Sequence, residues 1–299
     1  MSQITTDDTD RRHTATSPVV VGVDDSAAAI RAAQWAAVVA DARCAPLHLV
    51  HVARRHVDTP ASAEILDTAR RAVRQRWART SATLPPAINM LALRGDPATR
   101  LIGLSADACE VVVGSASRTT RSMLGSVATT LAASAHCPVA VIRPPASGAA
   151  AVGPVLVVTT PTDSGASLTL SAALRAATER RSELVVVTIA RPTARSSAPR
   201  AEHDIEALLA DHGRRFPTVR TRLVTYFGHT RTAIEKFCAT AQLVVTTRQR
   251  RPFWPPLSGM SYLTLQHTRC AVLVVPEQPV HPTAIERLGL RRTADQMIG

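Results

Sequence analysis

The sequence Val111-Val112-Val113-Gly114-Ser115-Ala116-Ser117, with Leu124-Gly125-Ser126-Val127 shortly after it, is typical of a buried strand, a loop of small residues and the start of a helix. Small residues let a backbone approach a ligand closely, and a helix that begins near Gly125 directs unpaired N–H groups and its positive dipole end at an anion. The same pattern also occurs in α/β proteins that bind no nucleotide. The stretch therefore predicts an α/β fold with a candidate phosphate-binding loop.

The chain repeats one pattern twice. Each half opens with an apolar run and an Asp-Ser pair, at 19–26 and at 155–164, and continues through an Ala-rich helix to a second apolar strand. Each half closes on a Cys before a final strand, at 136–142 and at 269–275. A repeat of about half the chain indicates a duplicated domain rather than a solenoid unit.

Runs of Val, Leu and Ile alternate with helical patterns in both halves. The first half has expected strands at 18–24, 46–52, 87–93, 110–115 and 138–143 and helices near 27–42, 60–80, 97–107 and 123–135. The second half has expected strands at 154–160, 183–189, 219–226, 242–247 and 271–275. Such alternation is typical of parallel strands covered by helices. The fold class is therefore α/β, with two tandem open-sheet domains of five mainly parallel strands and helices on both faces.

The length of 299 residues suffices for two domains that each bury a core. A linker candidate is Pro144-Pro145-Ala146-Ser147-Gly148, because proline ends a strand and Ser-Gly makes the backbone flexible. We therefore expect a mobile tail at 1–17, a first domain at 18–145, a linker at 146–152, a second domain at 153–277 and a second mobile tail at 278–299.

Composition restricts the class of protein. No apolar run is long enough to span a bilayer, and the polar N-terminus lacks a signal peptide's hydrophobic stretch, so we expect a cytoplasmic protein. The five Cys form no CxxC and have no clustered His, which argues against zinc and a disulfide framework. Cys137 and Cys270, at matching repeat positions, are expected to be packed thiols.

The net charge of +12 is carried almost entirely by arginine, since Lys236 is the only lysine. The arginines are scattered and few aromatic residues accompany them, so the chain offers few side chains on which the bases of single-stranded nucleic acid could stack. We do not expect specific recognition of nucleic acid, although non-specific attraction to polyanions stays open.

Four motifs carry a resemblance to a known family. They are Gly22-Val23-Asp24-Asp25-Ser26, the strand end Leu49-Val50-His51-Val52, the helix start Gly95-Asp96-Pro97 and the loop from Gly114 to Gly125-Ser126. With these motifs in a duplicated α/β unit, the chain resembles the universal stress protein family, most of all the tandem two-domain type common in actinobacteria. The resemblance covers 17–145 in motif and 153–277 mainly in pattern, and it implies a Rossmann-like fold of the adenine nucleotide alpha hydrolase type.

The resemblance also implies a nucleotide site. It would place adenine and ribose against Asp24 and Val52, and phosphates on the backbone N–H groups around Gly114, Ser115, Gly125, Ser126 and Val127. ATP-binding members have a second glycine where this chain has Ser117, and the seven residues from there to Gly125 are two fewer than the family pattern. Arg118 and Arg121 either offset phosphate charge or are solvated loop residues.

The second half departs further from this pattern. Three prolines in 252–256 remove N–H donors, and Phe253 and Trp254 fill the space that a phosphate would need. Aligning the Asp-Ser pairs puts Thr162 opposite Asp24. We therefore expect no ATP in the second half and a packing or interaction role for Phe253 and Trp254.

The final strands of the two halves predict how the halves combine. Val139-Ala140-Val141-Ile142 would be an exposed edge, and Val272-Leu273-Val274-Val275 is its natural cover. In the family the last strands of two domains pair, so the resemblance implies an internal pseudo-dimer that leaves other faces for a homodimer.

Evidence for catalysis is weak in this sequence. His48 and His51 are expected on one side of the second strand, as packed residues rather than bases. Asp25 or Ser26 is expected to cap the helix at Ala27, and Asp96 the helix at Pro97. Three functions stay open: an ATP-binding stress sensor or regulator with the nucleotide and Mg²⁺ in the first domain, a non-ATP-binding scaffold, and a slow ATPase or autokinase.

Overall fold

The computed structural model describes residues 17–54, 60–81, 83–115, 125–144, 153–160, 165–190, 198–248, 257 and 259–277. The first half contains β1(Val19–Gly22), α1(Ala27–Ala42), β2(Leu47–Ala53), α2(Pro60–Thr80), β3(Ile88–Arg94), α3(Pro97–Leu104), β4(Glu110–Gly114), α4(Ser126–Ser134) and β5(Val139–Ile142). The second half contains β6(Val155–Thr159), α5(Ala166–Glu179), β7(Leu184–Ala190), α6(Ala198–Gly213), β8(Thr221–Phe227), α7(Thr230–Cys238), β9(Leu243–Arg248), α8(Gly259–His267) and β10(Ala271–Pro276). Both expected tails (apart from Ser17) and the expected linker (146–152) lie outside the described residues.

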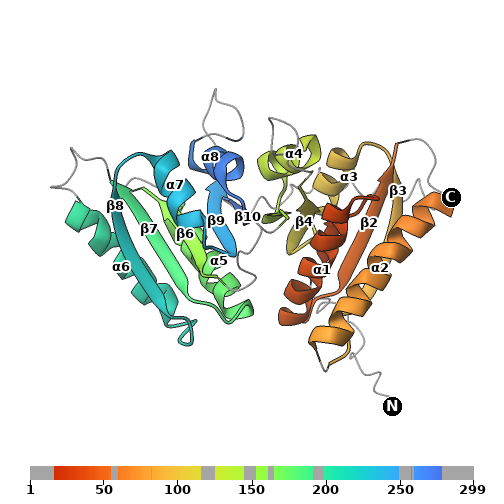
Figure 1. Ribbon diagram of the computed structural model, residues 1–299, viewed down its shortest axis with the longest axis horizontal. Helices are drawn as coiled ribbons and strands as arrows, with labels where there is room; N and C mark the ends of the chain where they lie inside the picture. Colours follow the sequence, from red (N-terminus) through yellow and green to blue (C-terminus); the bar gives the residue numbers. More distant parts are fainter. Residues whose placement is uncertain are drawn as a thin grey trace, which may run out of the picture.

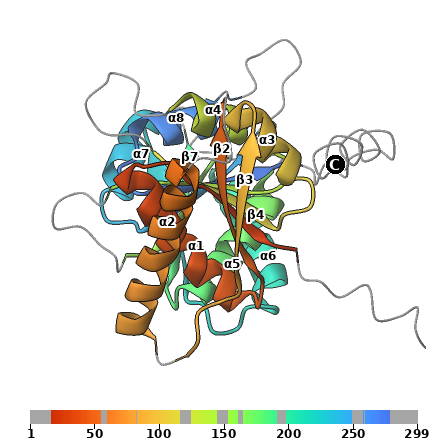
Figure 2. The same cartoon turned by 90° about the vertical axis from the view of Figure 1, so that its right-hand side faces the viewer.

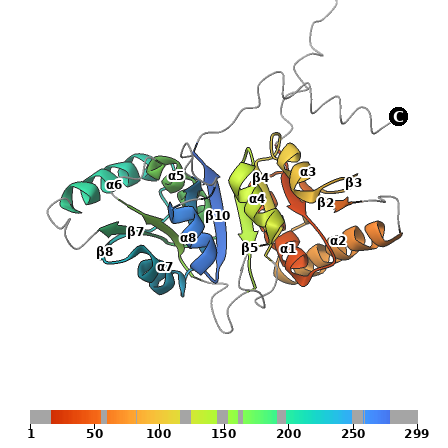
Figure 3. The ribbon, with the colours of Figure 1, turned by 90° about the horizontal axis from the view of Figure 1, so that it is seen from above.

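The strands form one sheet with the order β3-β2-β1-β4-β5-β10-β9-β6-β7-β8 (Figure 1). Every pairing within a half is parallel, as the Val-rich runs predict. The two halves meet where β5 pairs antiparallel with β10, Val139 opposite Val274 and Val141 opposite Val272 (Figure 3). The predicted α/β class with mainly parallel strands is therefore confirmed, and the two five-stranded sheets continue into one of ten strands.

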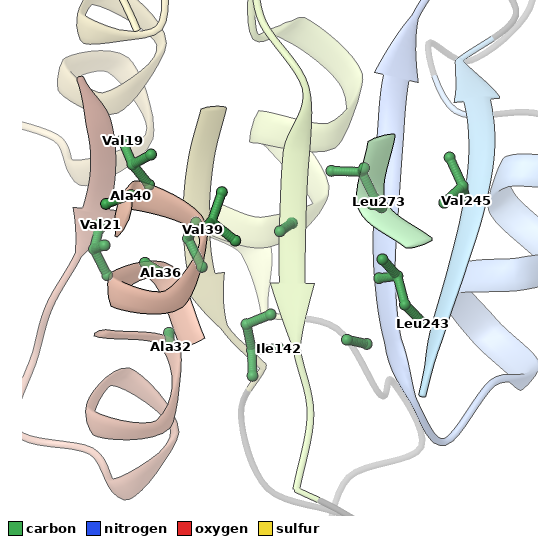
Figure 4. Packing of buried hydrophobic residues seen from close by; sticks show 14 of the residues in the cluster. Val19, Val21, Ala32, Ala36, Val39, Ala40, Ile142, Leu243, Val245 and Leu273 are labelled. Carbon is green, nitrogen blue, oxygen red and sulfur yellow. The ribbon is translucent and has the colours of Figure 1, made fainter. Parts of the chain in front are cut away.

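Helices cover both faces of the sheet (Figure 2). The alternation of side chains along β1 turns Val19 and Val21 to the face covered by α1, α2, α5 and α6, and Val20 to the face covered by α3, α4 and α8. α1 lays a row of alanines on the sheet, and this core continues through Ile142 of β5 to Leu273 of β10 (Figure 4). The apolar core therefore crosses the junction between the halves.

Local caps explain where two helices begin. The Ser26 side chain accepts a hydrogen bond from the Ala29 amide at 3.1 Å, which caps α1. Asp96 accepts one from the Thr99 amide at 3.0 Å ahead of Pro97, which caps α3. The Thr99 amide and hydroxyl hold the pKa of Asp96 below its usual value. The expected caps at Ser26 and Asp96 are confirmed.

Among the described residues, no helix combines the length and the apolar character needed to cross a membrane. The expected packed thiols differ in burial, since Cys137 is buried and Cys270 is partly buried. Burial raises the pKa of Cys270 to about 11, so the thiol form prevails at neutral pH.

A largely buried ionic cluster also joins the halves. Arg43, the residue after α1, donates to Glu179 of α5 at 2.7 Å and to Glu110 of β4 at 2.8 Å. The guanidinium of Arg180 lies 4.5 Å from the centre of the Trp35 ring. Burial alone would lower the Arg43 pKa, but the two carboxylates raise it above its usual value, so Arg43 stays charged.

We expect Arg43→Met to lower the free energy of unfolding by about 3 kcal/mol, because it leaves Glu110 and Glu179 buried without this cation. Adding Glu110→Leu, which copies Leu243 at the corresponding position of the second half, should recover part of the loss. Arg70→Met removes a half-exposed pair with Asp67 and should cost under about 1 kcal/mol. Urea unfolding measures all three, and equal losses for Arg43→Met and Arg70→Met would contradict the role of the cluster.

Candidate functional site

The strand order places a crevice at one edge of the first half. From β1 the chain crosses by way of α1 to β2 on one side, whereas β4 lies on the other side and is followed by α4. Connections that leave in opposite directions open a crevice outside the carboxyl ends of the strands, where open α/β sheets bind ligands. A cavity of about 620 Å³ lies there, and its lining includes Gly22, Val23, Asp24, Ser26, Arg31, Val50, His51, Val52, Pro97, Leu101, Val113, Gly114, Gly125, Ser126, Val127, Ala128 and Pro144.

The structure brings most of the predicted site residues together. The cavity is lined by Asp24, Val52, Gly114, Gly125, Ser126 and Val127. Ser115 is buried at the end of β4, and its amide donates to the Ile142 carbonyl at 2.8 Å. The Ser115 amide is therefore occupied by the sheet and is not a phosphate donor, which corrects the expectation for this group. Ser117, Arg118 and Arg121 lie outside the described residues.

Gly114 has a different structural task from the one its motif suggests. A Cβ atom on Gly114 would lie 2.5 Å from the carbonyl carbon and 2.6 Å from the carbonyl oxygen of Ala28. The missing side chain lets the first turn of α1 pack on the end of β4. The close approach is thus between two backbone segments, and it brings the start of α1 and the end of β4 to one cavity.

The N-terminus of α4 supplies hydrogen-bond donors. Gly125 is the N-cap residue, and within the part of the chain that is described no side chain caps this helix. The amides of Ser126, Val127 and Ala128 precede the first intrahelical bond, which runs from the Thr129 amide to the Gly125 carbonyl. The N-termini of α1 and α3, in contrast, are capped by the side chains of Ser26 and Asp96. The α4 terminus is therefore the one of these three suited to an external anion.

Asp24 and His51 are held at the strand ends. The Asp24 side chain is exposed, and one carboxylate oxygen accepts from the Ser26 amide at 3.0 Å. The His51 ring lies with Nδ1 2.9 Å from the Val23 carbonyl, so Nδ1 carries the proton and Nε2 is the remaining polar atom. This contact ties the end of β2 to the end of β1.

The expectation that His48 and His51 share one side of β2 is wrong. Residues three apart in a strand point to opposite faces. Nε2 of His48 lies 3.1 Å from the side-chain nitrogen Nδ2 of Asn89, and burial lowers the pKa of His48. His51 lines the cavity, and His48 is absent from its lining.

Sequence reasoning missed Arg31. This residue of α1 lines the cavity, and its buried Nε has no hydrogen-bond partner among the described residues. The signal available in the sequence was its place little more than one turn after the Ser26 cap, on a helix otherwise rich in alanine. A partly buried guanidinium beside unpaired amides favours binding of a negatively charged group.

The second half has different residues at the corresponding positions. Laying β6 and β9 on β1 and β4 by their registers puts Thr247 at Gly114, Arg248 at Ser115 and Thr160 at Asp24. The register thus replaces the expected partner of Asp24, Thr162, which lies outside the described residues. The Thr247 hydroxyl donates to the Gly165 carbonyl at 3.3 Å and contacts the Thr169 hydroxyl.

Part of the second-half prediction concerns residues that the structure does not describe. The proline-rich stretch at 252–256, with Phe253 and Trp254, lies outside the described residues. Thr160 carries no carboxylate, and Thr247 carries the side chain that Gly114 lacks. The described part of the second half therefore differs from the first at two positions of the candidate site.

The cavity can hold a ligand with an anionic end and an apolar body. Donors from α4 and Arg31 provide for the anion, while Val52, Leu101 and Pro97 provide apolar contact. No group of three or more His, Cys, Asp or Glu residues that could hold a metal ion occurs among the described residues. The chemistry supported by this arrangement is ligand binding.

The fold and the cavity define a doubly wound α/β protein with a candidate anion site at its switch point. The model of the Universal stress protein family matches residues 16–143. A universal stress protein of Mycobacterium tuberculosis is 32% identical over 266 residues, covering 86% of this chain and 95% of the relative. The chain belongs to the universal stress protein family.

Two further similarities extend over both halves. A second universal stress protein of Mycobacterium tuberculosis is 29% identical over 270 residues, which is 87% of this chain and 96% of the relative. The crystal structure of a universal stress protein from Archaeoglobus fulgidus DSM 4304 matches with a TM-score of 0.63 and 14% identity, covering 88% of this chain and 99% of that chain. The likeness to the solved structure supports the fold.

We expect Gly114→Ala to lower the free energy of unfolding by about 2 kcal/mol, because its Cβ meets the α1 backbone. Gly125→Ala is the matched control, since a Cβ there meets no atom of the described residues within 4 Å and its φ is −67°. It should leave stability within about 0.5 kcal/mol. Chemical denaturation compares the two, and a Gly114→Ala chain as stable as the control would contradict the packing argument.

Proposed function

We propose that this chain is a cytoplasmic stress-response regulator that binds an adenine nucleotide in its first half, with ATP and Mg²⁺ as the first ligand to test. The observation that carries the proposal is the uncapped N-terminus of α4, which faces a cavity shared with Arg31. Three amides and one guanidinium together suit a polyphosphate. The cavity volume of about 620 Å³ lies within the range of cofactor sites.

Each part of the ligand has a counterpart in this proposal. The phosphates bind the Ser126 and Val127 amides with Arg31 beside them. Adenine packs between Val52 and the other apolar lining residues, and the Asp24 carboxylate accepts a hydrogen bond from a ribose hydroxyl. Mg²⁺ arrives with the phosphates and supplies charge neutralisation. Ser117 and Arg118, which lie outside the described residues, belong to the same proposal as further residues at the phosphates.

The second half has a supporting part in this proposal. Thr247 and Thr160 replace the glycine and the carboxylate of the first half, so the nucleotide binds once per chain. We propose domains at 18–145 and 153–277, joined at 146–152 and held together in solution by the pairing of β5 with β10. Other faces are left for a homodimer, which light scattering detects as a doubled mass.

A scaffold without nucleotide is the second candidate. It is favoured by the Ser115 amide, which already donates within the sheet, and by Ser117, which stands where the family pattern has its second glycine.

A slow ATPase or autokinase is the third candidate. Asp24 is the only carboxylate among the described residues that line the cavity, and it is held by the Ser26 amide. Metal-dependent phosphate release by the purified chain would favour this third function.

Titration of the chain with Mg-ATP in a calorimeter tests the proposal, and we expect micromolar binding. Ser126→Pro removes one amide donor at the first helical position, where proline is tolerated and the preceding Gly125 is already extended. Ser126→Ala removes only the hydroxyl. We expect about tenfold weaker binding for Ser126→Pro and little change for Ser126→Ala. A wild-type chain that is folded and gives no heat of binding would establish the scaffold instead.

Arg31→Gln tests the cation of the site. Gln keeps a polar side chain but removes the charge, so we expect Mg-ATP to bind about tenfold more weakly and the affinity to depend less on salt concentration. Arg71→Gln is the control, because Arg71 lies on α2 with an exposed bond to Thr68. Equal affinities for wild type and Arg31→Gln across a salt series would remove Arg31 from the site.

A further inference from the structure

The C-terminus of α4 is held by the other half of the molecule. Ala135, the C-cap residue of this helix, presents its carbonyl to Arg248 at the end of β9, and the guanidinium donates to it at 3.0 Å. Arg248 is 3% exposed. By strand register Arg248 corresponds to Ser115, the residue after β4. The second half therefore has at this position a long side chain that reaches across the junction between the halves.

The contact has a reciprocal partner. Arg143, which follows β5, donates to the Leu265 and Thr268 carbonyls at the C-terminus of α8. α4 and α8 lie on the same face of the sheet, α4 beside β5 in the first half and α8 beside β10 in the second (Figures 1 and 3). Each half thus holds the last helix of the other half by an arginine.

Hydrogen bonds from a buried arginine to the C-terminus of a helix stabilise the position of that helix. The last carbonyls of a helix have no amide partner within the helix, and the negative end of the dipole attracts a cation. Burial makes the guanidinium depend on these acceptors, and burial lowers the pKa of Arg143. α4 has nine residues, a length of about 14 Å, so fixing its C-terminus also fixes the direction of its N-terminus.

The other end of α4 lies at the candidate site, where Ser126, Val127 and Ala128 line the cavity. We infer that Arg248 is a positioning residue for ligand binding in the first half, so the second half controls the affinity of that site through α4. The inference rests on the proposed function for its ligand, and on the Arg248–Ala135 contact for its mechanism. By linkage, a nucleotide at the N-terminus of α4 strengthens the hold at its C-terminus.

The test compares Arg248→Met with Arg143→Met in the full chain. Both variants remove a buried guanidinium from the junction, but the hydrogen bond of Arg248 goes to the C-terminus of α4 and those of Arg143 go to the C-terminus of α8. Calorimetry with Mg-ATP gives the affinity, and hydrogen exchange of the peptides that span α4 and α8 reports local opening without ligand. We expect Arg248→Met to raise the Kd at least about fivefold and to speed exchange in α4. Arg143→Met should leave the Kd within about twofold and speed exchange in α8.

Two results would overturn the inference. Equal losses of affinity in both variants would mean that any loosening of the junction disturbs the site. Unchanged exchange in α4 of the Arg248→Met chain would mean that the arginine does not hold this helix, whatever the ligand. A wild-type chain that binds no nucleotide contradicts the proposed function, and exchange in α4 then still decides whether Arg248 holds the helix.

Discussion

Antiparallel pairing of β5 with β10 is the interaction on which the rest of this structure depends. Each half alone would end in an open strand edge and an uncovered apolar face. Joining the edges makes one sheet, extends the core from α1 through Ile142 and Leu273, and buries polar groups on both faces of the junction. On one face these groups are Arg43, Glu110 and Glu179, and on the other Arg143 and Arg248. Their burial is tolerable only because each guanidinium finds carboxylates or helix carbonyls across the junction.

The two halves place different residues at equivalent positions of one fold. The same strand end holds Gly114 and Ser115 in the first half and Thr247 and Arg248 in the second. Glycine keeps α1 close and leaves a cavity, whereas threonine fills the space and bonds to Gly165. Among the described residues, two substitutions at one strand end therefore give the halves different contacts: Thr247 bonds to α5 within the second half, and Arg248 bonds to the C-terminus of α4 in the first.

The sequence could predict what depends on local pattern. The strands were expected to within two residues of their observed ends, and α1 and α2 at their observed bounds, because Val-rich runs and the Ser26 cap are signals within one segment. Two residues that line the cavity, Ser126 and Val127, could be singled out for the same reason, because they follow a glycine. Arg31, Arg43 and Arg248 could not, because their roles arise from partners more than sixty residues away or from a cavity that exists only after folding. The packing role of Gly114 could not be predicted for the same reason, since the group that needs its space is the backbone of α1, far away in the sequence.

Covalent duplication explains why such asymmetry is possible. In a symmetric dimer every substitution occurs twice, so an arginine at the end of the fourth strand would brace the partner's helix and at the same time place its bulk at the end of the site's own strand. In a tandem chain Ser115 and Arg248 change independently. The fourth strand of the second half can then end in an arginine that contacts the α4 helix of the first half, while the fourth strand of the first half keeps its glycine and serine beside the cavity.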